Sequence, residues 1–509
     1  MVAGGKVDER EVPPEEGRAR VRPELWISST YFAEGFPYGI INSLAEILFR
    51  DMGASLAGVG LTSLFHLPWN FKFFWAPLME RTLSMRRWIL LFEVALLGLF
   101  VAAGGIVFFR EGFGPELTLV LLSVIFLVAA FASASHDVAI DAFYLEAQNE
   151  KEQARHVGLR SSAYKVASIL VRGPGLALVA AVGWTLGLSA AAAVLAALAL
   201  FHLRVLKRLE EAHGALPTGS ARRKEPGARE KSSRRWLIWL FGCIALASLL
   251  MFLSYEVPAV RSALTGSTAM LVWSGLLVVG LTIGVLVSRR RLRNLRGEGA
   301  FSRLLSHPHF LVVLAFIVTF RLGESFLQKM KWPFLSEFVG LTKAEYGTLN
   351  GTIGVIVSFV GLIVGGRLIA RDGLERWFWP FLLAQNALNL LYAALALVPD
   401  GLLSHELNLG VVGLVIVCEE FGAGLGASVL MVFLMRLCHG QHRASEFALL
   451  TAVMTIGFTI SGALSGYVAE AVGYFGFFVA SFVLTLPMMG LGPHALRRSH
   501  DFAPRAGSS

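Results

Sequence analysis

The sequence predicts an all-α, polytopic membrane protein of two six-helix bundles with two additional helices between them, about fourteen spans in total. Hydrophobic residues make up 55% of the 509 residues, charged residues only 16%, and mean hydropathy is +0.63. A soluble surface needs about a quarter charged residues. Apolar runs of about 20 residues, the length that crosses a bilayer, recur along the chain. A short glycine pattern also recurs at a nearly constant offset, which indicates a duplication.

Each bundle is predicted from six apolar runs. The first six lie near 25–49, 58–79, 88–109, 116–146, 156–181 and 184–205, two more near 236–255 and 269–288, and the last six near 309–336, 345–369, 377–398, 408–437, 443–470 and 473–496. We therefore divide the chain into a disordered tail (1–23), an N-terminal bundle (24–206), a basic linker (207–235), two inserted helices (236–288), a second basic linker (289–308), a C-terminal bundle (309–497) and a tail (498–509).

The charges predict the orientation. The net charge of +9 gathers in alternate loops, among them the Arg222–Arg235 and Arg289–Arg296 clusters. Because cytoplasmic loops retain Lys and Arg, both termini are expected in the cytoplasm. The basic linkers are expected to contact membrane lipid rather than nucleic acid, since no aromatic residues are interleaved with the charge. Three separated cysteines without a CxxC pair predict no disulfide framework.

The duplication rests on two echoes. Residues 53–60 match residues 340–347 at an offset of 287, and the turn at Gly183 matches the turn at Gly473 at an offset of 290. In the first pair a Ser or Thr is placed to cap the helix that follows. Two repeated bundles around a midplane site are typical of secondary transporters.

Ionisable side chains inside a span are costly and usually functional. The number of residues between each charge and the nearest turn gives its depth in the bilayer. Antiparallel neighbours at one depth are expected to meet. This predicts three acid–base pairs, namely Glu34 with Lys72, Asp137 with Lys165, and Asp141 with Arg160.

Arg172 has no partner at its depth in this count, which suits an anion site, and it shares a helical face with Lys165, seven residues earlier. In the second half, residues at i, i+3 and i+7 form one polar stripe. The stripe consists of Arg321, Glu324 and Gln328.

Glu419 and Glu420 lie near the middle of their span with no cation close on the same helix. We expect them to be unpaired and to point to different faces, so that one lines a cavity and takes up a proton. Gln385 and Asn389 add neutral donors and acceptors nearby in the chain. Elsewhere, Glu46 and Glu93 are expected at the membrane interface.

Motifs for enzyme chemistry are missing. The tract from Cys438 to His442 has no fourth metal ligand, and Gly422–Gly426 follows no strand, so neither a metal nor a cofactor site is predicted. There is no Walker lysine, HExxH or GxSxG. The sequence therefore predicts no enzyme.

The chain resembles the AmpG-type permeases, the muropeptide branch of the major facilitator superfamily, which is related to acetyl-CoA transporters. The resemblance lies in four stretches, 31–37 (YFAEGFP), 67–81 (LPWNFKFFWAPLMER), 135–142 (SHDVAIDA) and 320–324 (FRLGE). It implies the major facilitator fold, two extra spans between the halves, and a cavity lined by the first, fourth, seventh and tenth core spans. His136, Glu80 and Arg172 depart from the pattern, where glutamine, aspartate and a small residue are expected.

The resemblance implies proton-coupled import of anhydromuropeptides by alternating access across the bacterial inner membrane, for peptidoglycan recycling. We expect a monomer that binds a small anionic substrate and protons. The alternatives are a carrier of another anionic solute, such as a CoA ester or a siderophore-like chelate, and a non-transporting receptor or scaffold.

We expect two sets of site residues, with sugar rings stacking on aromatic side chains such as Tyr31, Tyr38 and Trp332. The substrate-binding candidates are Glu34, Tyr38, Lys165, Arg172, Arg321, Glu324, Gln328, Gln385 and Asn389, and the proton-coupling or gating candidates are Lys72, Asp137, Asp141, Arg160, Glu419 and Glu420.

Overall fold

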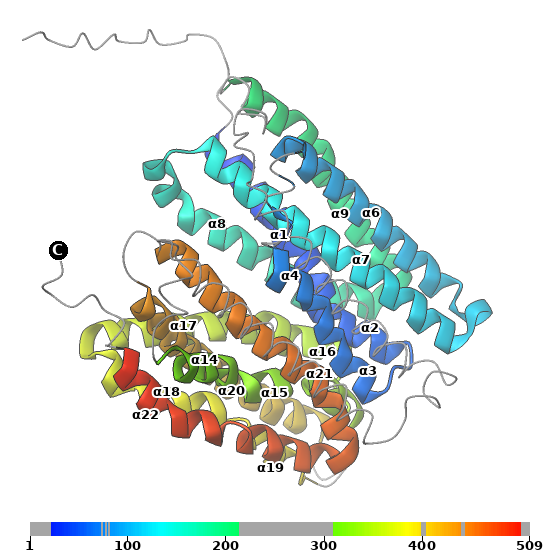
Figure 1. The fold of residues 1–509 in the computed structure, drawn as a ribbon. Helices are drawn as coiled ribbons and strands as arrows, with labels where there is room; N and C mark the ends of the chain where they lie inside the picture. Colours follow the sequence, from blue (N-terminus) through cyan, green and yellow to red (C-terminus); the bar gives the residue numbers. More distant parts are fainter. Residues whose placement is uncertain are drawn as a thin grey trace, which may run out of the picture.

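The computed structural model describes residues 22–72, 75–76, 79, 82–212, 309–398, 404–438 and 443–499. The two linkers, the inserted helices expected over 236–288 and most of both tails lie outside the described residues. Within them, the regular elements are helices, gathered into two bundles that lie side by side (Figure 1). The first bundle runs from blue to green in the figure and the second from green to red.

The N-terminal bundle contains helices for each of its six expected spans. Short π-helical and 3₁₀ turns interrupt three of these spans. The elements are α1 (Pro23–Gly39), η1 (Ile40–Leu44), α2 (Ala45–Asp51), α3 (Leu56–Leu61), η2 (Thr62–His66), α4 (Leu67–Phe71), α6 (Met85–Phe108), α7 (Arg110–Ala147), α8 (Glu150–Leu170), η4 (Val171–Gly175) and α9 (Leu176–Ala212).

The C-terminal bundle repeats this arrangement. Its elements are α14 (Phe310–Phe320), α15 (Leu322–Glu337), α16 (Lys343–Tyr346), η5 (Gly347–Gly354), α17 (Val355–Asp372), α18 (Leu374–Ala387), α19 (Leu390–Leu395), α20 (His405–Leu437), α21 (Arg443–Val483) and α22 (Leu486–Ser499).

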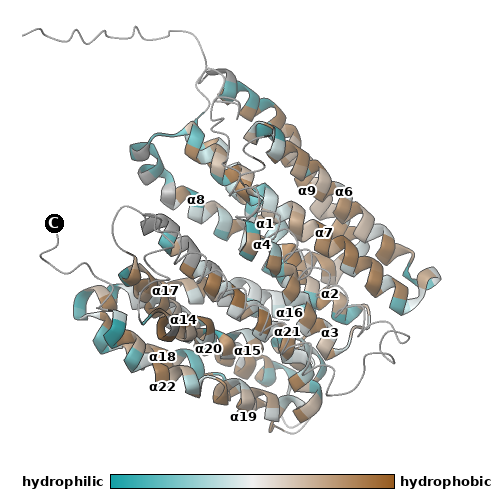
Figure 2. Cartoon of the chain, in the orientation of Figure 1, coloured by the Kyte–Doolittle hydropathy of each residue, from teal (hydrophilic) through white to brown (hydrophobic). Residues whose placement is uncertain are grey.

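The helices have apolar outer surfaces. Among the described residues, 6 helical segments are long and apolar enough to cross a membrane, and three of these segments continue through a glycine turn, at Gly114, Gly183 and Gly473. Leu91, Val94 and Val101 on α6 are examples of exposed apolar residues. Figure 2 shows the hydrophobic residues along the middle of the helices and hydrophilic ones at their ends. This distribution matches a bilayer as the surrounding solvent.

The two sequence echoes have the same backbone in both bundles. Gly53 and Gly340 have φ of 94° and 81°, and Gly183 and Gly473 have φ of 79° and 69°. Only glycine enters this region without a steric cost. The capping residues also correspond, since the hydroxyl oxygen of Ser55 accepts from the N–H of Gly58 and that of Thr342 from the N–H of Glu345.

Two seams of close backbone contact join the bundles, and each contains a glycine of the first echo. In the seam between α3 and α21, a β-carbon at Gly60 would lie 2.9 Å from Gly466 N, and one at Gly466 would lie 1.8 Å from the carbonyl oxygen of Leu56. In the seam between η4 and η5, a β-carbon at Gly347 would lie 3.1 Å from the carbonyl oxygen of Gly173. Small residues let helices approach this closely.

Ion pairs also join the bundles near the turns at Gly53 and Gly340, which we call the sealed end. Arg50 pairs with Glu337, and Lys343 Nζ lies 2.5 Å from Asp51 Oδ2. These side chains are between 20% and 38% exposed. A third pair, between Glu46 and Lys329 at 2.9 Å, is almost fully buried. The expectation that Glu46 lies at the lipid interface is therefore wrong, because it contacts the opposite bundle.

Candidate functional site

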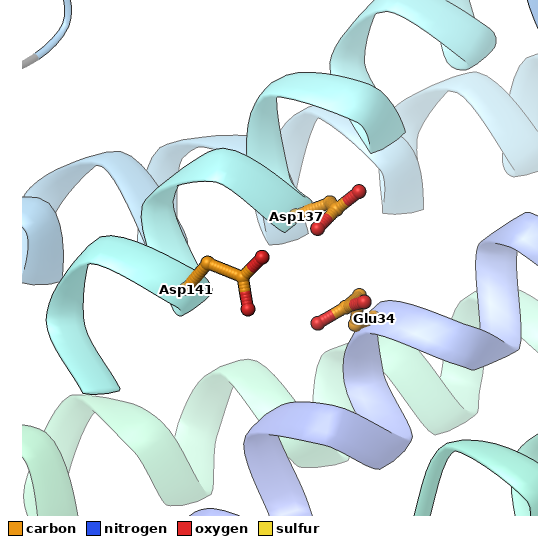
Figure 3. A group of neighbouring side chains, drawn as sticks. All are labelled: Glu34, Asp137 and Asp141. Atoms are coloured by element: carbon orange, nitrogen blue, oxygen red, sulfur yellow. The ribbon is translucent and has the colours of Figure 1, made fainter. Parts of the chain in front are cut away.

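The N-terminal bundle contains a cluster of three carboxylates from two helices. Glu34 on α1 and Asp137 and Asp141 on α7 each place a carboxylate oxygen within 4.8 Å of the others (Figure 3). Lys72 Nζ lies 2.5 Å from Asp137 Oδ2, and Arg160 lies 2.8 Å from Asp141 Oδ1. Glu34 Oε2 is buried and has no hydrogen-bond partner among the described residues. Two of the three acids are thus paired directly, and Glu34 is not.

These contacts confirm one expected pair and correct two. Asp141 pairs with Arg160 as predicted. Lys72 pairs with Asp137 instead of Glu34, and Lys165 has an exposed side chain. Residue counting gives the height of a side chain but not the face of the helix on which it lies. Counting therefore does not determine which of several side chains at one depth form an ion pair.

Aromatic residues hold the N-terminal cluster in place. Tyr31 donates a hydrogen bond of 2.9 Å from its hydroxyl to Asp141 Oδ1, and the Arg160 guanidinium lies 4.6 Å from the Tyr31 ring centre. Tyr31 is only 1% exposed and Trp332 only 3%. Neither ring has a free face for a sugar, so both expectations of sugar stacking are wrong for this conformation.

The predicted polar stripe in the C-terminal bundle forms as expected. Arg321 Nε donates to Glu324 Oε2 over 2.8 Å, and Gln385 Nε2 donates to the same oxygen over 3.1 Å. Gln328 Nε2 lies 3.4 Å from Glu420 Oε1. The stripe on α15 is therefore connected to α18 and α20.

Lys331 extends this stripe and was missed by the sequence analysis. Its ammonium lies 2.6 Å from Glu419 Oε2, 3.1 Å from Glu420 Oε1 and 3.1 Å from Asn350 Oδ1, and its side chain is fully buried. Glu419 and Glu420 are therefore paired with Lys331, and the expectation that they are unpaired is wrong, because their cation comes from another helix. The expectation that one of them lines a cavity and takes up a proton stays a prediction. Lys331 continues the i, i+3, i+7 pattern at i+10, and that periodicity is the signal that would have found it.

Asn389, another substrate-binding candidate, is 1% exposed, and its Nδ2 has no hydrogen-bond partner among the described residues. These facts do not test the predicted role of Asn389 in substrate binding, which stays a prediction.

Between the two clusters lie cations without acidic partners. Arg172 donates from Nε to Ser43 Oγ over 2.8 Å and makes no ion pair with any described residue. The exposed Lys165 lies within range of the charges of Arg172 in its own bundle and of Arg321 and Glu420 in the opposite bundle. The Tyr38 hydroxyl is likewise influenced by both Arg172 and Arg321. These candidates therefore meet at the interface of the bundles.

A third buried cluster lies inside the N-terminal bundle. Glu93 is 0% exposed, with Oε1 2.5 Å from His202 Nδ1 and 3.6 Å from His136 Nε2. His202 Nε2 lies 3.0 Å from Ser29 Oγ. The expectation that Glu93 lies at the membrane interface is wrong, because histidines from α7 and α9 surround it. No sequence count linked these three residues, since each lies on a different helix.

The arrangement is suited to binding ions and protons. Counted over the described residues, the first and the second cluster each contain one more carboxylate than cations. The first has three acids with Lys72 and Arg160, and the second has Glu419 and Glu420 with Lys331. An excess charge away from water is costly unless a proton or a ligand compensates it.

Sequence comparison finds related permeases. The chain is 25% identical over 461 residues to the anhydromuropeptide permease of Escherichia coli K12, covering 90% of this chain and 76% of the relative. It is 20% identical to the putative transporter AmpG 4 of Rickettsia felis, covering 89% and 92% of the two chains. No family model matches the chain.

Solved structures of transporters share the fold. A peptide transporter POT variant in complex with alafosfalin aligns with a TM-score of 0.63 and 14% identity, covering 93% of this chain and 94% of that one. A bacterial homologue of the lysosomal transporter Spinster aligns with a TM-score of 0.60 and 14% identity, covering 96% and 100%. The relatives are permeases and transporters rather than enzymes. The chain is a multi-pass transporter with the major facilitator fold, and in sequence it resembles the AmpG-type permeases over nine tenths of its length.

Proposed function

We propose that the protein imports anhydromuropeptides across the bacterial inner membrane by proton-coupled alternating access, as a step in peptidoglycan recycling. The similarity to the Escherichia coli anhydromuropeptide permease supports the substrate class. The observation that carries the mechanism is the cluster of Glu34, Asp137 and Asp141 inside the N-terminal bundle. The protein acts as a monomer in contact with membrane lipid, and both termini face the cytoplasm.

The N-terminal cluster is the first coupling site of this proposal. Three carboxylates share the two cations Lys72 and Arg160, which leaves one negative charge uncompensated. Asp137 and Asp141 each have a cation in direct contact, so Glu34 is the carboxylate of this cluster whose charge no cation in the cluster compensates directly. Binding one proton at Glu34 removes the excess charge and makes the cluster neutral.

The C-terminal cluster supplies the second coupling site. Lys331 is shared between Glu419 and Glu420, which again leaves one charge in excess. Gln328 contacts Glu420, and Gln385 contacts Glu324, which is the acid that neutralises Arg321. An anionic ligand at Arg321 would compete with Glu324 and so alter this hydrogen-bonded chain. Substrate and proton binding are linked in this way.

Alternating access requires the sealed end to open. We infer that this end faces the periplasm, because the basic loops gather at the opposite end. The pairs Arg50–Glu337 and Asp51–Lys343 are partly exposed, so water can replace each partner at little cost. The seams of glycine contact separate at the same time.

The proposal predicts that accumulation of labelled anhydromuropeptide in proteoliposomes needs a proton gradient. A proton that moves down 100 mV supplies about 2.3 kcal/mol, roughly a fiftyfold concentration ratio for a substrate that has no net charge of its own. Accumulation is expected to vanish with an uncoupler, and the variant Glu34→Gln is expected to lose accumulation while it keeps exchange of labelled for unlabelled substrate.

The matched control is Glu406→Gln, which neutralises an exposed acid at the start of α20 and should accumulate substrate like the wild type. Undiminished accumulation with the uncoupler would contradict proton coupling. Displacement of the label by acetyl-CoA but not by unlabelled muropeptide would contradict the substrate class.

A further inference from the structure

Four aromatic side chains of the N-terminal bundle form a continuous wall, made of Tyr38, His66, Trp69 and Tyr164. The ring centres of Tyr38 and Trp69 lie 5.0 Å apart, and those of Tyr38 and Tyr164 lie 5.8 Å apart. His66 and Trp69 are stacked at 5.8 Å. All four side chains are partly exposed, unlike Tyr31 and Trp332. The wall is therefore open to a ligand.

The backbone of α1 brings this wall together. A β-carbon at Gly35 would lie 3.0 Å from the carbonyl oxygen of Tyr164, so glycine lets α8 pack directly on α1. Tyr38 lies about one helical turn after Gly35 on α1, so this contact brings the ring of Tyr164 beside the ring of Tyr38. Helix α4 contributes Trp69 to the wall, and η2 contributes His66. Asn42 Oδ1 lies 3.3 Å from His66 Nδ1.

Two cations border the wall. Lys165 follows Tyr164 on α8, and the charge of Arg172 acts on both Tyr38 and Tyr164. Arg172 uses only Nε, on Ser43, in its hydrogen bond to a described residue. Other cations in the interior, such as Lys72 and Lys331, contact carboxylates directly. Arg172 is half-buried, and a charge that is partly removed from water is costly without a partner, so an anionic ligand at Arg172 would compensate it. Lys165 is exposed and can contact the same ligand.

We propose that this region is a two-part ligand site, in which the aromatic wall takes the face of a pyranose ring and Arg172 and Lys165 take anionic groups of the same molecule. The C–H face of a sugar ring packs against the electron-rich face of an aromatic ring. Seven residues of helix separate the two cations by about 10 Å. The ligand class is an oligosaccharide conjugate with at least two anionic groups, about 10 Å apart.

This inference rests on the proposed function, because it assigns the two parts of an anhydromuropeptide to separate surfaces. The disaccharide belongs on the wall, and the carboxylates of the peptide belong on Arg172 and Lys165. The C-terminal bundle then provides coupling rather than the main binding surface. The assignment is specific enough to be tested with fragments of the substrate.

The experiment measures binding to the purified full-length protein by calorimetry, with three probes. They are the intact disaccharide-tripeptide, the same molecule with its carboxylates amidated, and the disaccharide alone. The variants are Trp69→Leu and Arg172→Gln, with Trp379→Leu and Arg371→Gln as matched controls, since Trp379 is 40% exposed on α18 and Arg371 is 70% exposed at the end of α17.

Trp69→Leu is expected to weaken binding of all three probes by about tenfold or more. Arg172→Gln is expected to weaken the intact probe by about tenfold and to leave the amidated probe and the disaccharide unchanged, because only the lost charge-assisted bonds differ. Arg172→Lys should restore part of the lost affinity. Both control variants should bind like the wild type.

The inference is overturned if Arg172→Gln weakens the amidated and intact probes equally, or if neither variant changes binding. Melting curves identify a variant that does not fold, and Tyr164→Leu then replaces Trp69→Leu. If the wild-type protein transports the intact probe and both variants bind this probe as tightly as the wild type does, only this inference is contradicted. A wild-type protein that transports no muropeptide contradicts the proposed function itself.

Discussion

Replacement of Lys331 with glutamine is expected to lower the free energy of unfolding by about 3–5 kcal/mol, the range for removal of one partner from a buried ion pair. Lys331 is fully buried, and its ammonium contacts Glu419, Glu420 and Asn350. Without it, two adjacent carboxylates face each other away from water. We expect a lower melting temperature in detergent, measured by tryptophan fluorescence. We also expect no accumulation of substrate in proteoliposomes.

Two comparisons make this result specific. Lys343→Gln removes a cation whose side chain is 29% exposed and whose partner is Asp51, so it should cost about 0–1 kcal/mol. The double variant Lys331→Gln/Glu419→Gln restores the charge of the cluster to that of the wild type and should recover part of the stability. If Lys331→Gln melts at the wild-type temperature, the cluster is not the buried network described here.

The second large effect is expected at the seam between α3 and α21. A β-carbon at Gly466 would lie 1.8 Å from the carbonyl oxygen of Leu56 and 2.6 Å from Ala57 Cα, both of which are backbone atoms that cannot rotate away. Gly466→Ala must therefore push α21 from α3. Overpacking of this kind costs about 1–3 kcal/mol, which shifts an equilibrium between conformations by about five- to 150-fold.

Spin labels at the exposed residues Glu111 and Glu406, one in each bundle, would report this separation. Gly466→Ala should shift the distance distribution to longer values and reduce uptake by about tenfold. Gly366→Ala is the control, because a β-carbon there meets nothing within 4 Å. An unchanged distribution in Gly466→Ala would mean that this seam does not hold the bundles together.

Periodicity within one helix predicted contacts well. The polar stripe joins Arg321, which directly precedes α15, to Glu324 and Gln328 within it, and the local helical spacing is enough for it to form as expected. The glycine turns depend only on local backbone requirements, and both echoes have the same positive φ in each bundle. Such features are determined by residues close together in the sequence.

Contacts between helices were harder to predict, because they depend on how each helix is rotated about its axis. Lys72 reaches Asp137 on α7 rather than Glu34 on α1, although all three lie at a similar depth. The cation of Glu419 is Lys331, which lies on α15 and not on the helix of Glu419, so the spacing within α20 gives no sign of this pair. The histidines that surround Glu93 come from two further helices. In each case the missing information was the packing of the bundle.

The buried ties inside each bundle have a mechanical consequence. Glu93 and His202 link α6 to α9, and Lys331 links α15 to η5 and α20, all without access to water. Of the ion pairs that described residues form across the interface, Arg50–Glu337 and Asp51–Lys343 are partly exposed. To deform a bundle therefore requires breaking contacts worth several kcal/mol each, whereas a hydrated pair costs about 1 kcal/mol or less. The motion that costs the least free energy is therefore a rigid-body displacement of one bundle against the other. Among the ion pairs described here between the bundles, the buried pair of Glu46 and Lys329 resists this displacement most.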